Sequence, residues 1–214
     1  MIKVVSFDIG GTLLRCPKKR NLRELLKKSF KINEENFNYA YREHFIKKRV
    51  DENVFFELIE CSQKYISEIK QIINSYYNSI PKGSLFVDVI PVITELNNKG
   101  ISLISVSNKS YKNIATLKTY GIERFFSKEF YSCDIGYAKP EYELFKYVQS
   151  VIGVEPESIL HVGDSLKSDI IGASQMNWKT AYILRQMENI KDSTIAEYQI
   201  SDLFGVLSVV DILQ

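Results

Sequence analysis

An acidic residue directly after a short apolar segment is the first candidate for chemistry in this sequence. Residues 2–7 are mostly apolar and β-branched, a pattern typical of a buried strand in a parallel sheet, and Asp8 comes next. Open α/β sheets bind their ligands at the carboxyl ends of the strands. Gly10 and Gly11 allow the backbone to turn sharply near a ligand, and Thr12 adds a hydroxyl. By itself, Asp8 could be a nucleophile, a metal ligand or a helix cap.

Three further polar clusters follow at the ends of predicted strands or the starts of predicted helices: Ser107 with Asn108, Lys139, and Asp164 with Asp169. Carboxylate oxygens are ligands that Mg²⁺ prefers. A lysine supplies a fixed positive charge, and a serine hydroxyl or a backbone N–H before a helix supplies a hydrogen-bond donor to an anionic ligand. Alone, each residue would be a turn residue, a helix cap or a solvated lysine. His161 lies within a predicted strand and is interpreted as a core histidine.

Helices alone are predicted between residues 15 and 80. Apolar residues recur there at helical spacing, most clearly over residues 65–80. This segment has 14 Lys and Arg against 9 Asp and Glu. Most of these charges are expected on the outer faces of a small helical bundle, although some could overhang Asp8 and attract an anionic substrate.

After residue 83 the pattern alternates between strands and helices. Strands are predicted at residues 101–106, 128–133, 159–162 and 180–184, and helices at 91–98, 111–120, 203–213 and after Lys139, opened by Pro140. Such alternation favours an α/β fold, a doubly wound parallel sheet covered by helices on both faces. The chain therefore divides into a core domain (residues 1–14 and 82–214) and an all-helical cap domain (residues 15–81).

Composition bounds the possible classes of protein. The 214 residues are 45% hydrophobic and 25% charged with a net charge of +2, as in an ordinary globular protein without a nucleic-acid footprint. No apolar segment approaches the roughly 20 residues needed to span a bilayer, and the first residues lack the pattern of a signal peptide. The three cysteines, Cys16, Cys61 and Cys133, are scattered. We expect free thiols and a cytoplasmic protein with no membrane or nucleic-acid partner.

The four polar clusters, in this order and at these positions, resemble the motifs of the haloacid dehalogenase superfamily of phosphotransferases. The resemblance covers essentially the whole chain, with the helical segment in the place of the family's cap. It implies that Asp8 is a covalent nucleophile and that Asp8, Asp164 and Asp169 hold Mg²⁺ together with the backbone carbonyl of Gly10. It implies catalytic roles for Thr12, Ser107 and Lys139, and phosphate binding by Gly11, Ser107, Asn108 and Lys139.

One position departs from the family pattern. Phosphatases of the family usually carry a second aspartate two residues after the nucleophile, where it protonates the leaving group and then activates water. Here that residue is Gly10. Loss of a general acid–base group typically slows a reaction by about 10²–10⁴-fold, whereas the carbonyl of Gly10 can still contact the metal.

Three functions remain compatible with Gly10. The first, which we favour, is Mg²⁺-dependent hydrolysis of a small phosphorylated metabolite whose leaving group needs little protonation, such as an acyl phosphate. The second is phosphonate cleavage with a cap lysine, Lys47 or Lys48, as a Schiff base. The third is a regulatory protein that binds phosphate and Mg²⁺ with little turnover. The aromatic and small residues of the cap would permit a homodimer.

Overall fold

A six-stranded parallel sheet forms the centre of the protein. The computed structural model describes residues 1–17, 21–113, 115–185 and 195–214. In the sheet order β5-β4-β1-β6-β7-β8, the strands are β5 (Lys128–Tyr131), β4 (Ser102–Ser107), β1 (Val4–Phe7), β6 (Ile159–Gly163), β7 (Lys179–Ile183) and β8 (Tyr198–Ile200). Phe7 aligns with Ser105 of β4 and with Val162 of β6. The residues that follow these strands therefore meet at one edge of the sheet. The predicted parallel α/β fold is confirmed.

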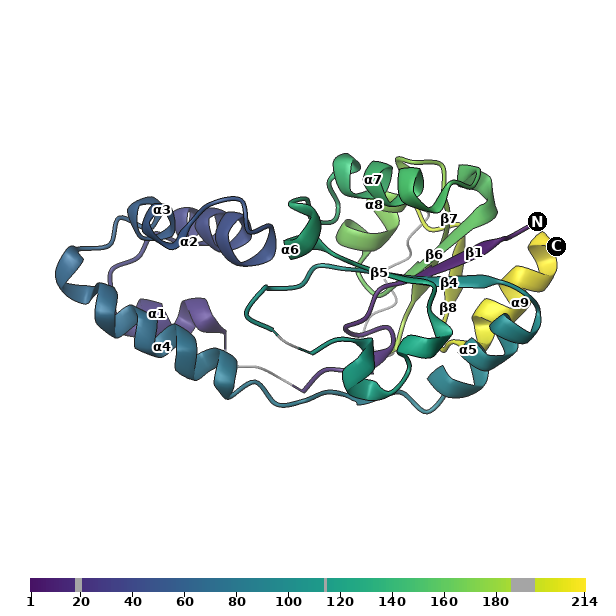
Figure 1. Cartoon of the computed structure of the whole chain (residues 1–214), viewed down its shortest axis with the longest axis horizontal. Coiled ribbons are helices and arrows are strands. Elements are labelled where there is room, and N and C mark those ends of the chain that lie inside the picture. Colours follow the sequence, from purple (N-terminus) through teal and green to yellow (C-terminus); the bar gives the residue numbers. More distant parts are fainter. Residues whose placement is uncertain (18–20, 114, 186–194) are drawn as a thin grey trace.

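Helices cover both faces of the sheet (Figure 1). On one face lie α5 (Val89–Asn98), α9 (Phe204–Leu213) and the 3₁₀ turns η3 (Leu117–Tyr120) and η4 (Glu123–Phe125). On the other lie α7 (Tyr142–Ile152) and α8 (Gly172–Ser174). The short helix α6 (Ser132–Ile135), the turn η5 (Pro156–Ser158) and the π-helix η6 (Leu166–Ile171) join strands to helices. Each face has its own apolar core, because the residues of a buried strand alternate between the two faces.

Between β1 and α5 the chain forms a separate helical block, which we define as residues 21–80. Its helices are α1 (Leu22–Ser29), α2 (Glu34–Tyr41), the π-helix η1 (Arg42–Ile46), α3 (Glu52–Leu58), η2 (Gln63–Tyr65) and α4 (Ile66–Asn78). Asn21, Asn33 and Asp51 cap α1, α2 and α3 through side-chain acceptors. The block buries its own apolar cluster, in which Phe37, Phe45 and Phe55 pack edge to face. Figure 1 shows it beside the carboxyl edge of the sheet.

A two-stranded antiparallel ribbon lies at the base of the helical block. Strand β2 (Leu14–Arg15) leads toward the block and pairs with β3 (Ser84–Leu85), which leads away from it. The two connections between sheet and block are thus hydrogen-bonded to each other. Sequence analysis did not anticipate this ribbon, because two-residue strands leave no detectable alternation.

Several predicted elements are corrected by the structure. The helix expected at residues 111–120 is reduced, within the described residues, to the 3₁₀ turn η3. The side chains of Ser110 and Asn113 accept bonds from nearby backbone N–H groups, which competes with helix formation. Helix α7 begins at Tyr142, so Pro140 precedes it rather than opening it. Strand β8 was not predicted. In the part of the chain that the structure describes, no helix is long and apolar enough to cross a membrane.

Candidate active site

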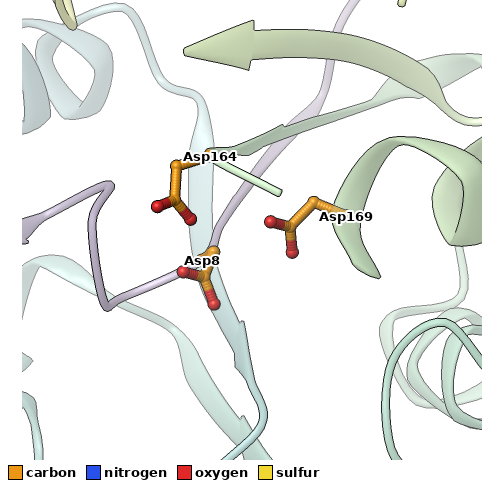
Figure 2. A group of neighbouring side chains, drawn as sticks. All are labelled: Asp8, Asp164 and Asp169. Atoms are coloured by element: carbon orange, nitrogen blue, oxygen red, sulfur yellow. The ribbon is translucent and has the colours of Figure 1, made fainter. Parts of the chain in front are cut away.

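Three aspartates converge at the carboxyl edge of the sheet (Figure 2). Asp8 follows β1, Asp164 follows β6, and Asp169 lies in η6. Each offers one carboxylate oxygen, and these oxygens lie within 4.8 Å of one another. Asp8 and Asp169 are buried, whereas Asp164 is exposed and its carboxylate points toward Asp8. Three converging carboxylates are a donor set that fits Mg²⁺.

Glycine is required for this convergence at Gly11. Its φ angle is +85°, a conformation that other residues rarely adopt. A Cβ atom there would lie 1.9 Å from Oδ2 of Asp164. Gly10 is different, because a Cβ at that position would meet only Cys16 Sγ, at 3.4 Å. Position 10 therefore has room for a side chain, and the absence of an acid there is not imposed by packing.

Lys139 joins two of the aspartates. Its side chain is 2% exposed, and its Nζ donates to Asp8 Oδ1 at 2.6 Å, to Asp169 Oδ1 at 2.5 Å and to the Val106 carbonyl at 2.8 Å. All three donor positions of the ammonium are thus occupied. The structure brings Lys139 and the aspartates together as a single charged cluster, although they lie far apart in sequence.

The charges in this cluster shift one another's pKa. Burial opposes ionisation of Lys139, but Asp8 and Asp169 outweigh it and raise its pKa. Burial likewise opposes ionisation of Asp169, yet Lys139 and His161 hold its pKa below the usual value. For Asp8, burial outweighs the attraction of Lys139 and raises the pKa. Desolvation, followed by the charge of Asp8, raises the pKa of Asp164 to about 7. A divalent cation at this site would favour the ionised form of all three carboxylates.

The residues after β4 support Lys139. Ser107 ends that strand and borders the cavity described below. The Asn108 side chain donates to the Lys139 carbonyl at 2.9 Å and accepts from the Lys139 N–H at 2.8 Å. Because the side-chain amide of Asn108 is hydrogen-bonded to Lys139, the predicted contact of Asn108 with phosphate would be made by its backbone N–H. The structure thus adds a positioning contact that the sequence did not indicate.

The loop after β1 is stabilised by contacts with Arg185. Thr12 is fully buried, and within the described residues its Oγ1 has no hydrogen-bond partner. Its carbonyl accepts from Arg185 Nη2 at 2.6 Å, and Arg185 also forms an ion pair with Asp88 at 2.6 Å. Arg185 and Asp88 were not among the predicted site residues. They fix the turn that presents Asp8, Gly10 and Gly11.

His161 is fully buried, as expected of a core histidine, but it also contacts the site. Its Nε2 lies 3.4 Å from Asp169 Oδ1, and its Nδ1 lies 2.9 Å from Ser6 Oγ. Ser6 and His161 occupy the same register on the neighbouring strands β1 and β6. A pair of polar residues inside two otherwise apolar central strands is the signal that could have revealed this contact.

The two lysines considered for Schiff-base chemistry lie apart from the aspartates. Lys47 is buried, and its Nζ forms ion pairs with Glu43 and with Glu141, both at 2.6 Å. Lys48 is exposed, with its Nζ 5.8 Å from the centre of the Tyr111 ring. Lys47 thus joins the helical block to the segment that follows Lys139.

A cavity of about 700 Å³ lies between the helical block and the edge of the sheet. Gly10, Ser107 and Asn108 contribute to its core side, and Tyr41, Ile46, Tyr76 and Tyr77 contribute from the block. Pockets of about 300–1,000 Å³ accommodate ligands of drug-like size. The cavity thus gives a substrate access to the loops that carry the predicted phosphate-binding residues.

Comparisons with known proteins agree with this arrangement. The model of the haloacid dehalogenase-like hydrolase family matches residues 2–177. The chain is 28% identical over 240 residues to the glyceraldehyde 3-phosphate phosphatase of Methanocaldococcus jannaschii, a match that covers 98% of this chain and 97% of that protein. It is 33% identical over 130 residues to the Methanopyrus kandleri glyceraldehyde 3-phosphate phosphatase, covering 58% of this chain and 56% of that relative. A solved 2-haloacid dehalogenase from Pseudomonas syringae pv. Tomato has a TM-score of 0.71 at 19% identity over 100% of both chains, which shows the shared fold.

Proposed function

Because the chain belongs to the haloacid dehalogenase-like hydrolases, we propose that it is a Mg²⁺-dependent phosphohydrolase of a small phosphorylated metabolite, with Asp8 as covalent nucleophile. The observation that carries the proposal is the cluster of Asp8, Asp164 and Asp169, whose carboxylate oxygens lie within 4.8 Å of one another. The phosphatase names of the two relatives above agree with it. The helical block is the cap that covers the substrate.

Asp8 is the proposed nucleophile. Its carboxylate is held by Lys139 at the carboxyl edge of the sheet, where the loops after β1 and β4 border the cavity. Attack by one carboxylate oxygen forms an aspartyl-phosphate, and the bond to the leaving group breaks. Lys139 and the Ser107 hydroxyl supply positive charge and a donor for the phosphoryl oxygens. Bound Mg²⁺ offsets the repulsion between the Asp8 carboxylate and the phosphate.

The missing acid at position 10 restricts the leaving group. A side chain there would point toward Cys16, and glycine leaves this position without a proton donor. Substrates whose leaving group departs without a proton are therefore favoured over alkyl esters. Phosphonate cleavage gains no support, because the ammonium of Lys47 is already paired with Glu43 and Glu141 and the exposed Lys48 lies near the Tyr111 ring.

The test is Mg²⁺-dependent release of phosphate from acetyl phosphate by the wild type and by Asp8→Asn. We expect the wild type to be active with Mg²⁺ and inactive in EDTA, and Asp8→Asn to lose activity by more than about 10³-fold. A matched control is Asp211→Asn, which removes an exposed carboxylate paired with Lys99 at 2.7 Å and is expected to keep wild-type activity. Undiminished turnover by Asp8→Asn would refute the covalent mechanism.

A further inference from the structure

The described lining of the cavity contains lysines and no acidic residue. Among the described residues that line the cavity, three are lysines, namely Lys82, Lys109 and Lys112, and none is an aspartate or a glutamate. The whole chain, by contrast, has 28 Lys and Arg against 26 Asp and Glu. A cleft lined by one sign of charge concentrates ligands of the opposite sign.

These lysines differ from the paired lysines elsewhere in the molecule. Within the part of the chain that the structure describes, none of the three forms an ion pair with a carboxylate. The Nζ of Lys109 lies 4.2 Å from the centre of the Tyr131 ring, and the Nζ of Lys112 donates to the amide oxygen of Asn74 at 3.2 Å. Lys139 and Lys47, by contrast, each contact two carboxylates. The cavity lysines therefore retain charge that an anionic ligand can neutralise.

The same cavity has aromatic walls. Its lining includes five tyrosines, Tyr41, Tyr76, Tyr77, Tyr120 and Tyr131. The hydroxyls of Tyr41 and Tyr77 lie 3.1 Å apart, so these side chains support each other. Tyrosines offer flat apolar surfaces with a polar end. Together with a volume of about 700 Å³, they suit a substrate with an organic body larger than a three-carbon unit.

We infer that the substrate is an organic diphosphate, whose terminal phosphoryl group is transferred to Asp8 and whose second phosphate is bound by Lys109 and Lys112. Two independent observations converge on this class. Gly10 provides no acid, and a departing phosphate needs none, since the second pKa of a phosphate ester is about 6. The unpaired lysines provide positive charge in the cavity that Gly10, of the loop after Asp8, also lines. The inference rests on the proposed phosphohydrolase function and specifies its substrate.

The reaction balances without a further reagent. An Asp8 carboxylate oxygen bonds to the terminal phosphorus while the bond from that phosphorus to the bridging oxygen breaks. The bridging oxygen keeps the electron pair and leaves as part of a phosphate monoester. Water then attacks the phosphorus of the aspartyl-phosphate, the bond to Asp8 breaks, and inorganic phosphate and one proton are released.

The test compares hydrolysis of diphosphates with that of matched monophosphates. The probes are ADP and UDP against AMP and UMP, with pyrophosphate, acetyl phosphate and phosphoglycolate as further substrates. We expect kcat/KM to be at least about tenfold higher for a nucleoside diphosphate than for its monophosphate. A preference for phosphoglycolate over both diphosphates would instead assign the lysines to a carboxylate and overturn the inference.

Variants of the cavity lysines test whether Lys109 and Lys112 bind the second phosphate of the substrate. Lys109→Gln and Lys112→Gln should each lower the ratio of kcat/KM for ADP to that for acetyl phosphate by about tenfold, the effect of losing one charge-assisted hydrogen bond. The matched control is Lys146→Gln on α7, whose Nζ lies 5.8 Å from the Tyr142 ring and which does not line the cavity. It should leave the ratio unchanged. Unchanged ratios in both cavity variants would overturn the inference.

Failure of the inference can be distinguished from failure of the proposed function. Turnover of acetyl phosphate without turnover of any diphosphate would leave the phosphohydrolase intact and reject the diphosphate. If no substrate is hydrolysed, the diphosphate inference is tested without turnover, by calorimetric measurement of ADP and AMP binding to Asp8→Asn with Mg²⁺. Tighter binding of ADP than of AMP, weakened by Lys109→Gln, is the expected result, and equal binding contradicts it.

Discussion

Two buried lysines make similar contacts in two parts of the molecule. At the edge of the sheet, the Nζ of Lys139 contacts Asp8 at 2.6 Å and Asp169 at 2.5 Å. In the helical block, the Nζ of Lys47 contacts two glutamates, both at 2.6 Å. Burial and ion pairing are thus nearly the same in the two places, so neither property identifies the lysine that is close to the chemistry.

The neighbours of the two lysines make the difference. Beside Lys139, Asp164 is a third acidic group with a raised pKa and, within the described residues, no ion pair, and the cluster borders loops that open into the cavity. Beside Lys47 the Glu141 carboxylate also accepts a hydrogen bond from the Ala138 N–H at 3.0 Å and lies 3.3 Å from Arg42. Burial opposes ionisation of Glu141, but Lys47 outweighs this effect and lowers the pKa of Glu141. The first cluster thus has an acidic group available to a ligand, whereas the charged groups of the second cluster are already paired with one another.

The two clusters meet in the segment that carries Lys139. Arg42, from η1 of the helical block, donates to the carbonyls of Ala138 and Lys139, both at 3.0 Å. Asn108 holds the same peptide from the side of the sheet. Docking of the block therefore contacts the backbone of Lys139, while the Lys139 ammonium is held by core residues, namely Asp8, Asp169 and the Val106 carbonyl.

The largest expected effect comes from Lys139→Gln. Removal of the ammonium leaves Asp8 and Asp169 buried without their partner. We therefore expect the free energy of unfolding, measured in urea, to fall by about 3–5 kcal/mol. Phosphate release from acetyl phosphate should fall by about 10³-fold, because a fixed charge on the phosphoryl oxygens is lost.

Mg²⁺ provides the control for this variant. If the aspartates bind the ion, millimolar Mg²⁺ should raise the urea midpoint of Lys139→Gln, because a ligand that binds only the folded state stabilises it. Asp164→Asn in the same background should reduce that shift. A urea midpoint that does not respond to Mg²⁺ would show that the Lys139 cluster, like the Lys47 cluster, binds no metal and has a structural role.

The next largest effect is a gain of activity in Gly10→Asp. A Cβ at position 10 meets only Cys16 Sγ at 3.4 Å, and Gly10 lines the cavity, so we expect the new side chain to be accommodated. We expect hydrolysis of an alkyl phosphomonoester to rise by about 10²-fold, while hydrolysis of acetyl phosphate changes little. Gly11→Asp is the matched contrast, since its Cβ would lie 1.9 Å from Asp164 and should abolish activity. A Gly10→Asp enzyme inert on both substrates would count against a phosphohydrolase.

The sequence predicted the cluster at the sheet edge because strand order determines it. Asp8 and Asp164 each follow a strand, Lys139 lies in the segment between β5 and α7, and the carboxyl ends of parallel strands share one edge. Their meeting therefore required no knowledge of side-chain packing. The fold was predictable for the same reason, from alternation of apolar strands and amphipathic helices.

The contacts around that cluster could not be predicted in this way. The bonds of Arg42 and Asn108 to Lys139 depend on how separate elements dock, and His161 reaches Asp169 through the interior of the sheet. Lys47 has the sequence environment of an exposed helical lysine, since its partner Glu141 lies 94 positions further along the chain. Pairings over such separations leave no periodic signal in one sequence.

The smallest expected effect comes from Lys47→Gln, the same substitution in the second cluster. Glu141 keeps Arg42 and the Ala138 N–H as partners, so within the described residues only the buried Glu43 loses its ion pair. We therefore expect a loss of about 1–3 kcal/mol in the free energy of unfolding. Activity on acetyl phosphate should fall by less than about tenfold, which corresponds to less than about 1.4 kcal/mol in the barrier.

Lys70→Gln is the control for Lys47, because Lys70 forms a 2.6 Å ion pair with Glu52 on the same helical block, with side chains 40% and 44% exposed. An exposed pair of this kind contributes about 0–1 kcal/mol, so this variant should unfold nearly as the wild type does. The difference between the two variants measures what burial adds at the junction of block and core. If Lys47→Gln instead lost as much activity as Lys139→Gln while remaining folded, Lys47 would act on the substrate, and carbon–phosphorus cleavage would become the better hypothesis.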